Sequence, residues 1–256
     1  MHPANSNDLG CLGDSGSAAY GVSADGSTVV GFSDGPDGRE AYRWTQSGGM
    51  QGLGFLPAAN NLSRANAVSG DGNTVVGSGY GGAFIWTPST GMTNLETTGP
   101  LNDPFYGQPN AISADGTTVG GQSPEAWLWT ESGGLNFLGF NQAVYGVSAD
   151  GSVAVGGDQW SSSSGTAFIW DSTNGTRPLQ DYLQNTLGLD LSGWTLYAAL
   201  GISDDGTKIV GVGINQLGIQ EAWYADISSV PLPPAIWLFG TGLLGVIGIA
   251  RRKKTF

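Results

Sequence analysis

The same pattern of apolar strand-forming runs and a polar turn recurs five times along the chain. It reads "GVSADGSTVVG" at 21–31, and the later copies are "AVSGDGNTVVG" (67–77), "AISADGTTVGG" (111–121), "GVSADGSVAVG" (146–156) and "GISDDGTKIVG" (201–211). In each copy an Asp-Gly pair separates two strand-forming runs, which predicts a hairpin whose turn requires positive φ. Recurrence of one such segment indicates a repeat architecture.

A second apolar marker follows each hairpin. The five copies are "AYRWT" (41–45), "AFIWT" (83–87), "AWLWT" (126–130), "AFIWD" (167–171) and "AWYAD" (222–226). In "AFIW" the residues two apart share a face, and both faces are apolar, so the strand should be covered on both sides. We therefore expect Trp44, Trp86, Trp129 and Trp170 to pack between neighbouring repeats rather than to stack on a ligand.

A third marker completes most of the repeats, as in "MQGLGFL" (50–56), "MTNL" (92–95), "LNFLGF" (135–140) and "TRPLQDYL" (176–183). Four short strands in about 45 residues are typical of one β-propeller blade. The fifth repeat lacks a fourth strand, whereas "DLGCLG" at 8–13 resembles one. The sequence therefore predicts an all-β fold, a β-propeller of about five four-stranded blades, closed when 8–13 pairs with 221–227.

The aspartates of the five turns are Asp25, Asp71, Asp115, Asp150 and Asp205. Asp tolerates the turn conformation and bonds to nearby backbone, and the serine two residues earlier can support the same turn. Calcium binding is the functional alternative, but a calcium ion needs several converging oxygen ligands, and one Asp per turn falls short. The sequence favours a structural role for these aspartates and predicts no metal site.

Composition narrows the possible chemistry. Cys11 is the only cysteine and His2 the only histidine, so a Ser-His-Asp triad, a Cys-His pair and the usual zinc sites lack their residues. Residues 1–230 carry a net charge of −16, which repels phosphate backbones and disfavours nucleic-acid binding. No catalytic residue and no cofactor are therefore predicted.

The C-terminal segment differs from the repeats. Residues 235–250 contain no charge, and the basic cluster Arg251, Arg252, Lys253 and Lys254 follows them. As a helix this run would span roughly 24 Å, slightly less than a hydrocarbon core of about 30 Å, with Trp237 at one interface and the basic cluster at the other. A transmembrane helix at 235–250 is predicted over a buried core helix, and the basic cluster places residues 1–230 outside the cytoplasm.

This tail resembles the PEP-CTERM sorting signal of Gram-negative bacteria. The matching residues are "VPLPP" (230–234), the Gly- and Leu-rich run 237–250 and "RRKK" (251–254). Within the motif Pro231, Leu232 and Pro233 correspond to the family pattern, with Leu232 where the family usually has Glu. The resemblance implies that 230–256 is a sorting signal recognised by an exosortase at the inner membrane. The protein would then be anchored at the cell surface or released, often alongside exopolysaccharide.

The N-terminus does not fit export by itself. Residues 1–7 are polar and predicted to be disordered, and no signal peptide is visible in them. An outward-facing protein needs one, so we expect either a miscalled start or a missing N-terminal piece.

The repeats resemble the HAF family of bacterial extracellular repeats. The residues that carry this resemblance are "LGFLP" (53–57), the segment 67–77 and "AFIWTPSTGM" (83–92). It extends over nearly all of 8–227, and we take 8–229 as the repeat domain. The resemblance implies a secreted, propeller-like repeat protein and supplies no catalytic residues.

Departures from the repeat are the candidate binding residues. Trp160, Tyr80, Phe105 and Tyr106 are aromatic residues in loops near Asp or Asn, where they could stack on sugar rings or, alternatively, fold back over a blade edge. The longest insertion, 178–200, has leucines every four residues (Leu179, Leu183 and Leu187), which predicts a short amphipathic helix.

These observations predict an exported, surface-anchored or secreted protein of the extracellular matrix or exopolysaccharide layer, with a binding or structural role and no enzymatic activity. Two alternatives remain open. One is a lectin-like sugar binder that uses the loop aromatics. The other is a polysaccharide-acting enzyme with a carboxylate pair, although the available acids, Glu96, Asp103, Glu125, Asp158 and Asp190, form no motif that selects a pair.

Overall fold

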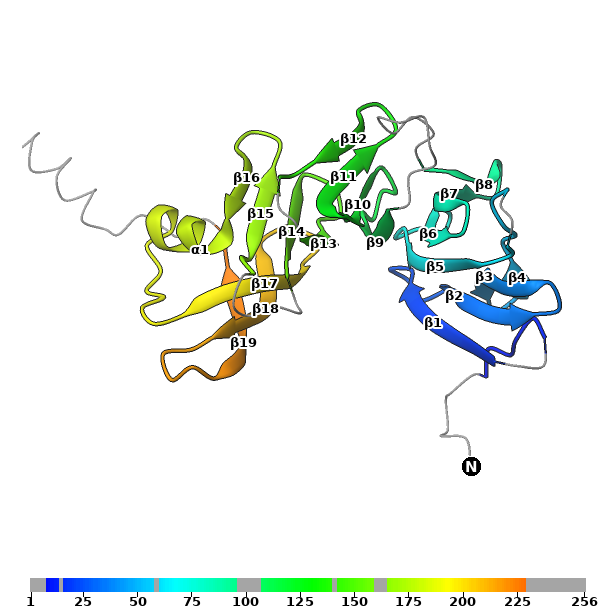
Figure 1. Ribbon diagram of the computed structural model, residues 1–256, viewed down its shortest axis with the longest axis horizontal. Coiled ribbons are helices and arrows are strands. Elements are labelled where there is room, and N and C mark those ends of the chain that lie inside the picture. Colours follow the sequence, from blue (N-terminus) through cyan, green and yellow to red (C-terminus); the bar gives the residue numbers. More distant parts are fainter. Residues whose placement is uncertain are drawn as a thin grey trace, which may run out of the picture. The chain divides into compact units, whose positions relative to one another are not determined.

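The chain folds into a succession of antiparallel β-meanders (Figure 1). The computed structural model describes residues 8–13, 16–57, 60–95, 107–139, 142–158 and 165–228. These residues form three four-stranded sheets and one seven-stranded sheet. By contacts the chain divides into two units, Met1–Asp226 and Ile227–Phe256, and all the sheets belong to the first.

The three four-stranded sheets each follow chain order. Sheet A contains β1 (Gly16–Val22), β2 (Thr28–Gly35), β3 (Gly38–Thr45) and β4 (Gly49–Gly52). Sheet B contains β5 (Ser63–Val68), β6 (Val75–Gly79), β7 (Gly82–Thr87) and β8 (Gly91–Asn94). Sheet C contains β9 (Gln108–Ile112), β10 (Thr118–Ser123), β11 (Glu125–Thr130) and β12 (Gly134–Phe137).

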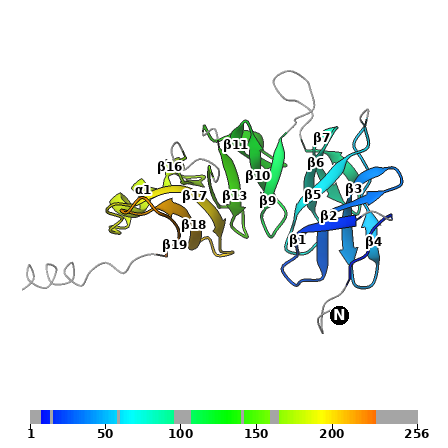
Figure 2. The ribbon, with the colours of Figure 1, turned by 60° about the horizontal axis from the view of Figure 1, so that its bottom comes forward.

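Sheet D joins two repeats. It contains β13 (Ala143–Val147), β14 (Val153–Gly157), β15 (Phe168–Asp171), β16 (Gly175–Pro178), β17 (Thr195–Ile202), β18 (Lys208–Ile214) and β19 (Gln220–Asp226). A single residue pair, Gly157 with Ala198, connects β14 to β17. We therefore describe five modules: sheets A, B and C, then β13–β16 as module 4 and β17–β19 as module 5 (Figure 2).

The insertion between modules 4 and 5 is helical, as the leucine spacing predicts. It consists of α1 (Leu179–Asp181) and the π-helix η1 (Tyr182–Thr186), and Leu179 and Leu183 are buried. The Gln180 side chain fastens this segment to β17, because its amide donates to the Trp194 carbonyl at 2.8 Å and accepts the Leu196 N–H at 3.0 Å.

Each module contains the same irregularity where its first two strands pair. In each module the first strand has a bulge five residues before the turn aspartate. The bulged residues of modules 1 to 5 are Tyr20, Asn66, Asn110, Tyr145 and Leu200. Opposite the bulge lies the glycine that ends each repeat segment, such as Gly77. A Cβ at Gly77 would lie 2.0 Å from the Arg64 carbonyl oxygen and 2.7 Å from the Phe84 ring, so no larger residue fits.

Side chains between successive modules form the core. One cluster joins modules 1 and 2 and includes Val30, Ala41, Val75 and Phe84, with Trp86 packed against it. Equivalent clusters join modules 2 and 3, with Trp129, and modules 3 and 4, with Trp170. The expectation that these three tryptophans pack between repeats is confirmed. Trp44 is half-buried and lines a groove instead.

The predicted closed five-bladed propeller is wrong. Residues 8–13 form no strand and lie against sheet A, where the Leu12 N–H donates to the Ser33 hydroxyl at 2.9 Å. In the described part of the chain, β19 pairs with β18 alone, so no strand from the N-terminus completes module 5. The first and last sheets thus remain separate rather than sharing a blade.

The predicted transmembrane helix also needs correction. Among the described residues, no helix has the length and apolar character that crossing a membrane requires. The segment 235–250, on which the prediction was based, lies outside the described residues. The described residues accordingly form an all-β array of modules with one short helical insertion.

Candidate functional site

The five Ser-x-Asp-Gly turns share one internal pattern of hydrogen bonds. In the second turn the Ser69 hydroxyl donates to Asp71 Oδ1 at 2.6 Å and accepts the Thr74 N–H at 2.9 Å. Asp71 Oδ1 also accepts the Asn73 N–H at 3.0 Å. The same contacts recur around Asp25, Asp115, Asp150 and Asp205. Each aspartate thus has Oδ1 engaged in its own turn.

Backbone hydrogen bonds also connect each turn to the turn of the next module. They run from the Ala24 N–H to the Gly70 carbonyl (3.0 Å), Gly70 to Ala114 (2.9 Å), Asp115 to Ala149 (3.1 Å) and Ala149 to Asp204 (2.9 Å). We call this continuous series the turn row. Within the described residues no group of three His, Cys, Asp or Glu side chains could hold a metal ion. The geometry of the turn row is that of a structural connection between modules.

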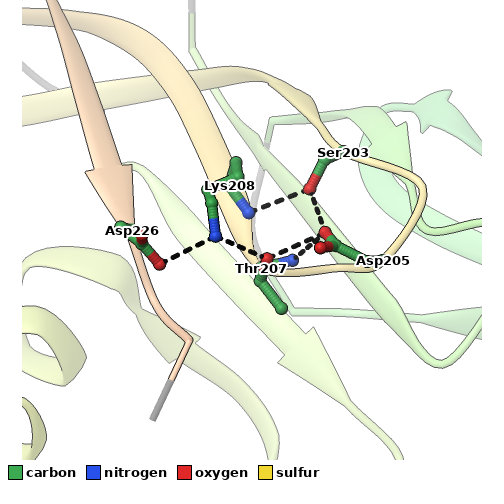
Figure 3. A network of polar contacts seen from close by, with 5 residues as sticks. All are labelled: Ser203, Asp205, Thr207, Lys208 and Asp226. Carbon is green, nitrogen blue, oxygen red and sulfur yellow. Dashed lines mark hydrogen bonds and ion pairs between the residues drawn. The ribbon is translucent and has the colours of Figure 1, made fainter. Parts of the chain in front are cut away.

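The fifth turn is extended by an ion pair (Figure 3). The Lys208 ammonium donates to Thr207 Oγ1 at 2.9 Å and to Asp226 Oδ1 at 3.0 Å, while the Thr207 hydroxyl donates to Asp205. This network connects the turn to the end of β19. The pair is well exposed to solvent, so its contribution to stability is small.

The lowered pKa values of the turn aspartates predict that the protein loses stability in acid. Hydrogen bonds lower the pKa of Asp25, Asp150 and Asp205 to about 2, mainly from the backbone N–H of Ser27 and Ser152 and from the Ser203 hydroxyl respectively. Because these folded-state pKa values lie below that of an unfolded aspartate, about 3.9, the stabilisation is complete above that value. It should be lost progressively as the pH falls from about 4 to about 2.

Urea unfolding at a series of pH values measures this loss as a falling midpoint. Asp25→Asn serves as a matched variant, because it removes one titrating group and should flatten the fall. A midpoint that stays constant through this pH range in the unmodified chain would contradict the role of the turns.

Two open grooves lie between modules beside the turn row. One, about 540 Å³, is lined by residues of module 1 and by Asp71. The other, about 810 Å³, contains Asp115 and Glu131. Burial raises the pKa of Asp115, but hydrogen bonds from Ser113 and Thr117 outweigh it and hold that pKa below its usual value. Asp115 therefore lacks the raised pKa that a glycosidase proton donor needs.

A smaller cavity of about 360 Å³ lies where modules 1, 2 and 3 meet. We call it the arginine–tyrosine pocket; it is lined by Arg39, Leu62, Arg64, Ser78, Gly79, Tyr80 and Gln108. Tyr80 is 53% exposed, so much of its ring faces solvent. A bridge between Arg39 and Leu62 and a hydrogen bond from Asn66 Nδ2 to the Pro109 carbonyl, 2.7 Å, hold the three modules together there.

The two arginines of this pocket differ in their partners. Arg39 Nε lies 2.9 Å from Asp34 Oδ1, and its guanidinium carbon is 4.1 Å from the centre of the Phe32 ring. Arg64 donates from Nε to the neutral Asn66 amide at 2.9 Å and lies 5.5 Å from the Tyr20 ring centre. Within the described residues Arg64 has no carboxylate partner. It is the available cation of the pocket.

Of the predicted sugar-binding residues, the structure places only Tyr80, which lines this pocket. Trp160, Phe105 and Tyr106 lie outside the described residues, as do the sorting motif (Pro231, Leu232 and Pro233) and the predicted membrane anchors (Trp237, Arg251, Arg252, Lys253 and Lys254). Among the acids considered for catalysis, Glu96 and Asp103 are also outside, and Asp190 binds Ser192 in a local turn.

Sequence reasoning missed Arg39, Arg64 and Gln108. A signal for two of them was present: Arg64 and Gln108 stand five residues before the turn serine, where modules 1, 4 and 5 have alanine. A polar residue at a position that is alanine in the other three modules therefore distinguishes modules 2 and 3, and both of these residues line the pocket.

Comparison with known proteins supports the fold only. No family model matches the chain, and a search of curated proteins finds no match. Solved structures that resemble it include an oligogalacturonate lyase from Vibrio parahaemolyticus (11% identity, 81% of this chain and 61% of that one, TM-score 0.54). Others are a protein assigned as TolB from Agrobacterium tumefaciens (15%, 82% and 76%, 0.49) and TolB from Acinetobacter baumannii (13%, 82% and 54%, 0.46).

The chain thus spans less than two thirds of the lyase and of the Acinetobacter TolB. At such low identity the likeness to the lyase, which among these three structures has the TM-score above 0.5, concerns the arrangement of strands and not the chemistry.

Proposed function

We propose that the chain is an exported, non-enzymatic repeat protein of the extracellular polysaccharide layer, and that it binds a carboxylated polysaccharide in the arginine–tyrosine pocket. The observation that carries this proposal is Arg64, which lines the same pocket as the exposed Tyr80 and has no carboxylate partner among the described residues.

The local positive charge of this pocket, in contrast to the acidic chain as a whole, supports an acidic sugar as the ligand. The described residues contain 18 acidic and five basic side chains, and two of the five basic ones line this single pocket. Arginine presents paired N–H donors that match a carboxylate, and such charge-assisted hydrogen bonds are stronger than neutral ones. Gln108 and Ser78 add donors and acceptors for hydroxyl groups, and the Tyr80 ring offers an apolar surface for a sugar face.

Export is proposed from the sequence resemblances. The tail at 230–256 resembles a PEP-CTERM sorting signal, so an exosortase at the inner membrane is the proposed processing partner. The mature protein would then lie at the cell surface or outside the cell. The resemblance of the repeats to HAF proteins supports the same location.

A polysaccharide-acting enzyme is the competing function. Among the described residues no carboxylate lines the arginine–tyrosine pocket, so its described lining lacks the acid pair of a glycosidase. The 810 Å³ groove does contain two acids, of which Asp115 is held by its own turn.

Binding of uronic-acid oligosaccharides tests the proposal. Arg64→Gln should weaken binding by about tenfold or more, because a charge-assisted hydrogen bond contributes about 1.5–3 kcal/mol. Lys208→Gln is the matched control, since it removes one positive charge from module 5, outside the pocket. Calorimetry of the full chain with acidic and neutral oligosaccharides gives both affinities.

Equal affinity for acidic and neutral oligosaccharides, or equal weakening by the Arg64 and Lys208 variants, would refute the pocket assignment. Release of shortened sugar products during the measurement would favour the enzyme instead.

A further inference from the structure

The interfaces of modules 1 with 2, 2 with 3 and 3 with 4 use the same two faces. The leading face of one module, for example Val30 and Ala41 in module 1, packs against the trailing face of the next, such as Val75 and Phe84 in module 2. The leading residues Val76 and Ala83 pack in the same way on Val119 and Trp127 of module 3. All eight of these residues are at most 1% exposed.

In the part of the chain that the structure describes, no further module packs on the leading face of module 5. We define this face as Val210, Ala222 and Tyr224, which follow the same repeat register. Val210 is 48% exposed and Tyr224 62%, and Ala222 is exposed too. The equivalents of Val210 and Ala222 are buried: Val30, Val76 and Val155 are each 0% exposed, as are Ala41, Ala126 and Ala167.

The trailing face of module 1 is uncovered in part. We define the uncovered part as Val22 and Val29, whereas Tyr42, at the repeat position of Phe84 and Trp127, is 1% exposed. Val22 is 60% exposed, whereas its counterparts Val68, Ile112 and Val147 all pack against the inter-module clusters. Val29 is half-buried, although Val75 and Val119 at its repeat position are completely buried.

The turn row ends at the same two modules. Within the described residues, the Ala24 carbonyl accepts no bond from a preceding turn, and the Asp204 N–H donates to no following one. The array therefore has an acceptor and an apolar trailing face at one end. It has a donor and an apolar leading face at the other.

We propose that these two faces bind each other between copies of this chain, with module 5 of one copy docked on module 1 of the next. This interface would continue the series of module contacts already formed inside the chain, because it joins the same repeat positions and can form the same backbone hydrogen bond between turns. Because the two faces differ, the contact is head-to-tail and can add further copies.

Complementary blocking variants test this association in the full chain. Val22→Lys buries a charge in the trailing face and leaves the leading face intact, whereas Tyr224→Lys does the reverse. By sedimentation velocity in mild detergent, we expect the unmodified chain to form oligomers that grow with concentration. Each variant alone should be monomeric, and an equimolar mixture should form a dimer with one copy of each that grows no further.

Leu217→Lys is the control, because Leu217 is 75% exposed in the β18–β19 turn and belongs to neither face. It should associate like the unmodified chain. A chain that is monomeric at every concentration would overturn the proposal; so would association that both blocking variants leave unchanged, as contacts between the C-terminal tails would. A mixture that stays monomeric would do the same.

Discussion

Gly77→Ala should lower the free energy of unfolding by about 3 kcal/mol or more, near the upper end of the cost of overpacking a core. The new methyl group would lie 2.0 Å from the Arg64 carbonyl oxygen and 2.7 Å from the Phe84 ring. The carbonyl belongs to the bulged strand β5 and the ring to the buried face of β7, so neither can move away cheaply. Urea unfolding followed by tryptophan fluorescence measures the loss.

Gly35→Ala is the matched control for this change. Gly35 is the last residue of β2, just as Gly79 is the last residue of β6, the strand that contains Gly77. The nearest atom to a Cβ added at Gly35 is 3.6 Å away, which is an ordinary contact. We expect an effect within about 0.5 kcal/mol. Similar losses from the two substitutions would show that the bulge does not demand glycine.

Gly151→Ala should cost about 2–4 kcal/mol, the second-largest effect. Part is backbone strain, because Gly151 has φ of 70°, where a residue with a Cβ is disfavoured by about 1–2 kcal/mol. The rest comes from packing between modules, since the added Cβ would lie 2.2 Å from Oγ1 of Thr118 in the module before.

Gly26→Ala separates these two causes. Gly26 has nearly the same φ, 73°, but belongs to the first turn of the row, and no atom lies within 4 Å of an added Cβ. Its cost should be the backbone strain alone, about 1–2 kcal/mol. Equal losses at Gly26 and Gly151, measured by thermal and urea unfolding, would mean that the turn row adds no packing energy.

The turns and strands could be predicted from the sequence because the same local motif recurs five times. Asp-Gly between β-branched runs specifies the turn, and the two apolar faces of "AFIW" specify a strand covered on both sides. Both signals depend only on residues close together in the chain. The turns at Asp25 and Asp71 and the packing of Trp86 follow from them.

Closure of the array could not be read in this way. The segment 8–13 resembles a fourth strand, but its partner is decided by long-range contacts, and the Ser33 hydroxyl with the end of β2 holds it at sheet A. The bond between Leu12 and Ser33 has no counterpart in a repeat pattern. An apolar signature shows that a strand needs a neighbour without showing which neighbour it obtains.

The arginine–tyrosine pocket was hidden for a related reason. Arg39, Arg64 and Gln108 belong to three modules and are unremarkable one by one, because polar residues on strands usually face solvent. Only the stacking of modules brings them together. Tyr80 could be singled out in advance since an aromatic side chain in a Gly-rich loop departs visibly from the repeat.

The backbone bonds that connect successive turns have a consequence for how such genes change. These contacts involve main-chain atoms, and the flanking faces recur through modules 1 to 4, so the boundaries between those modules are chemically alike. Recombination that duplicates or deletes one whole unit would create a new boundary of the same kind as those already present. Descendants of this gene are therefore free to differ in length by complete units, while insertions of partial units would break the series.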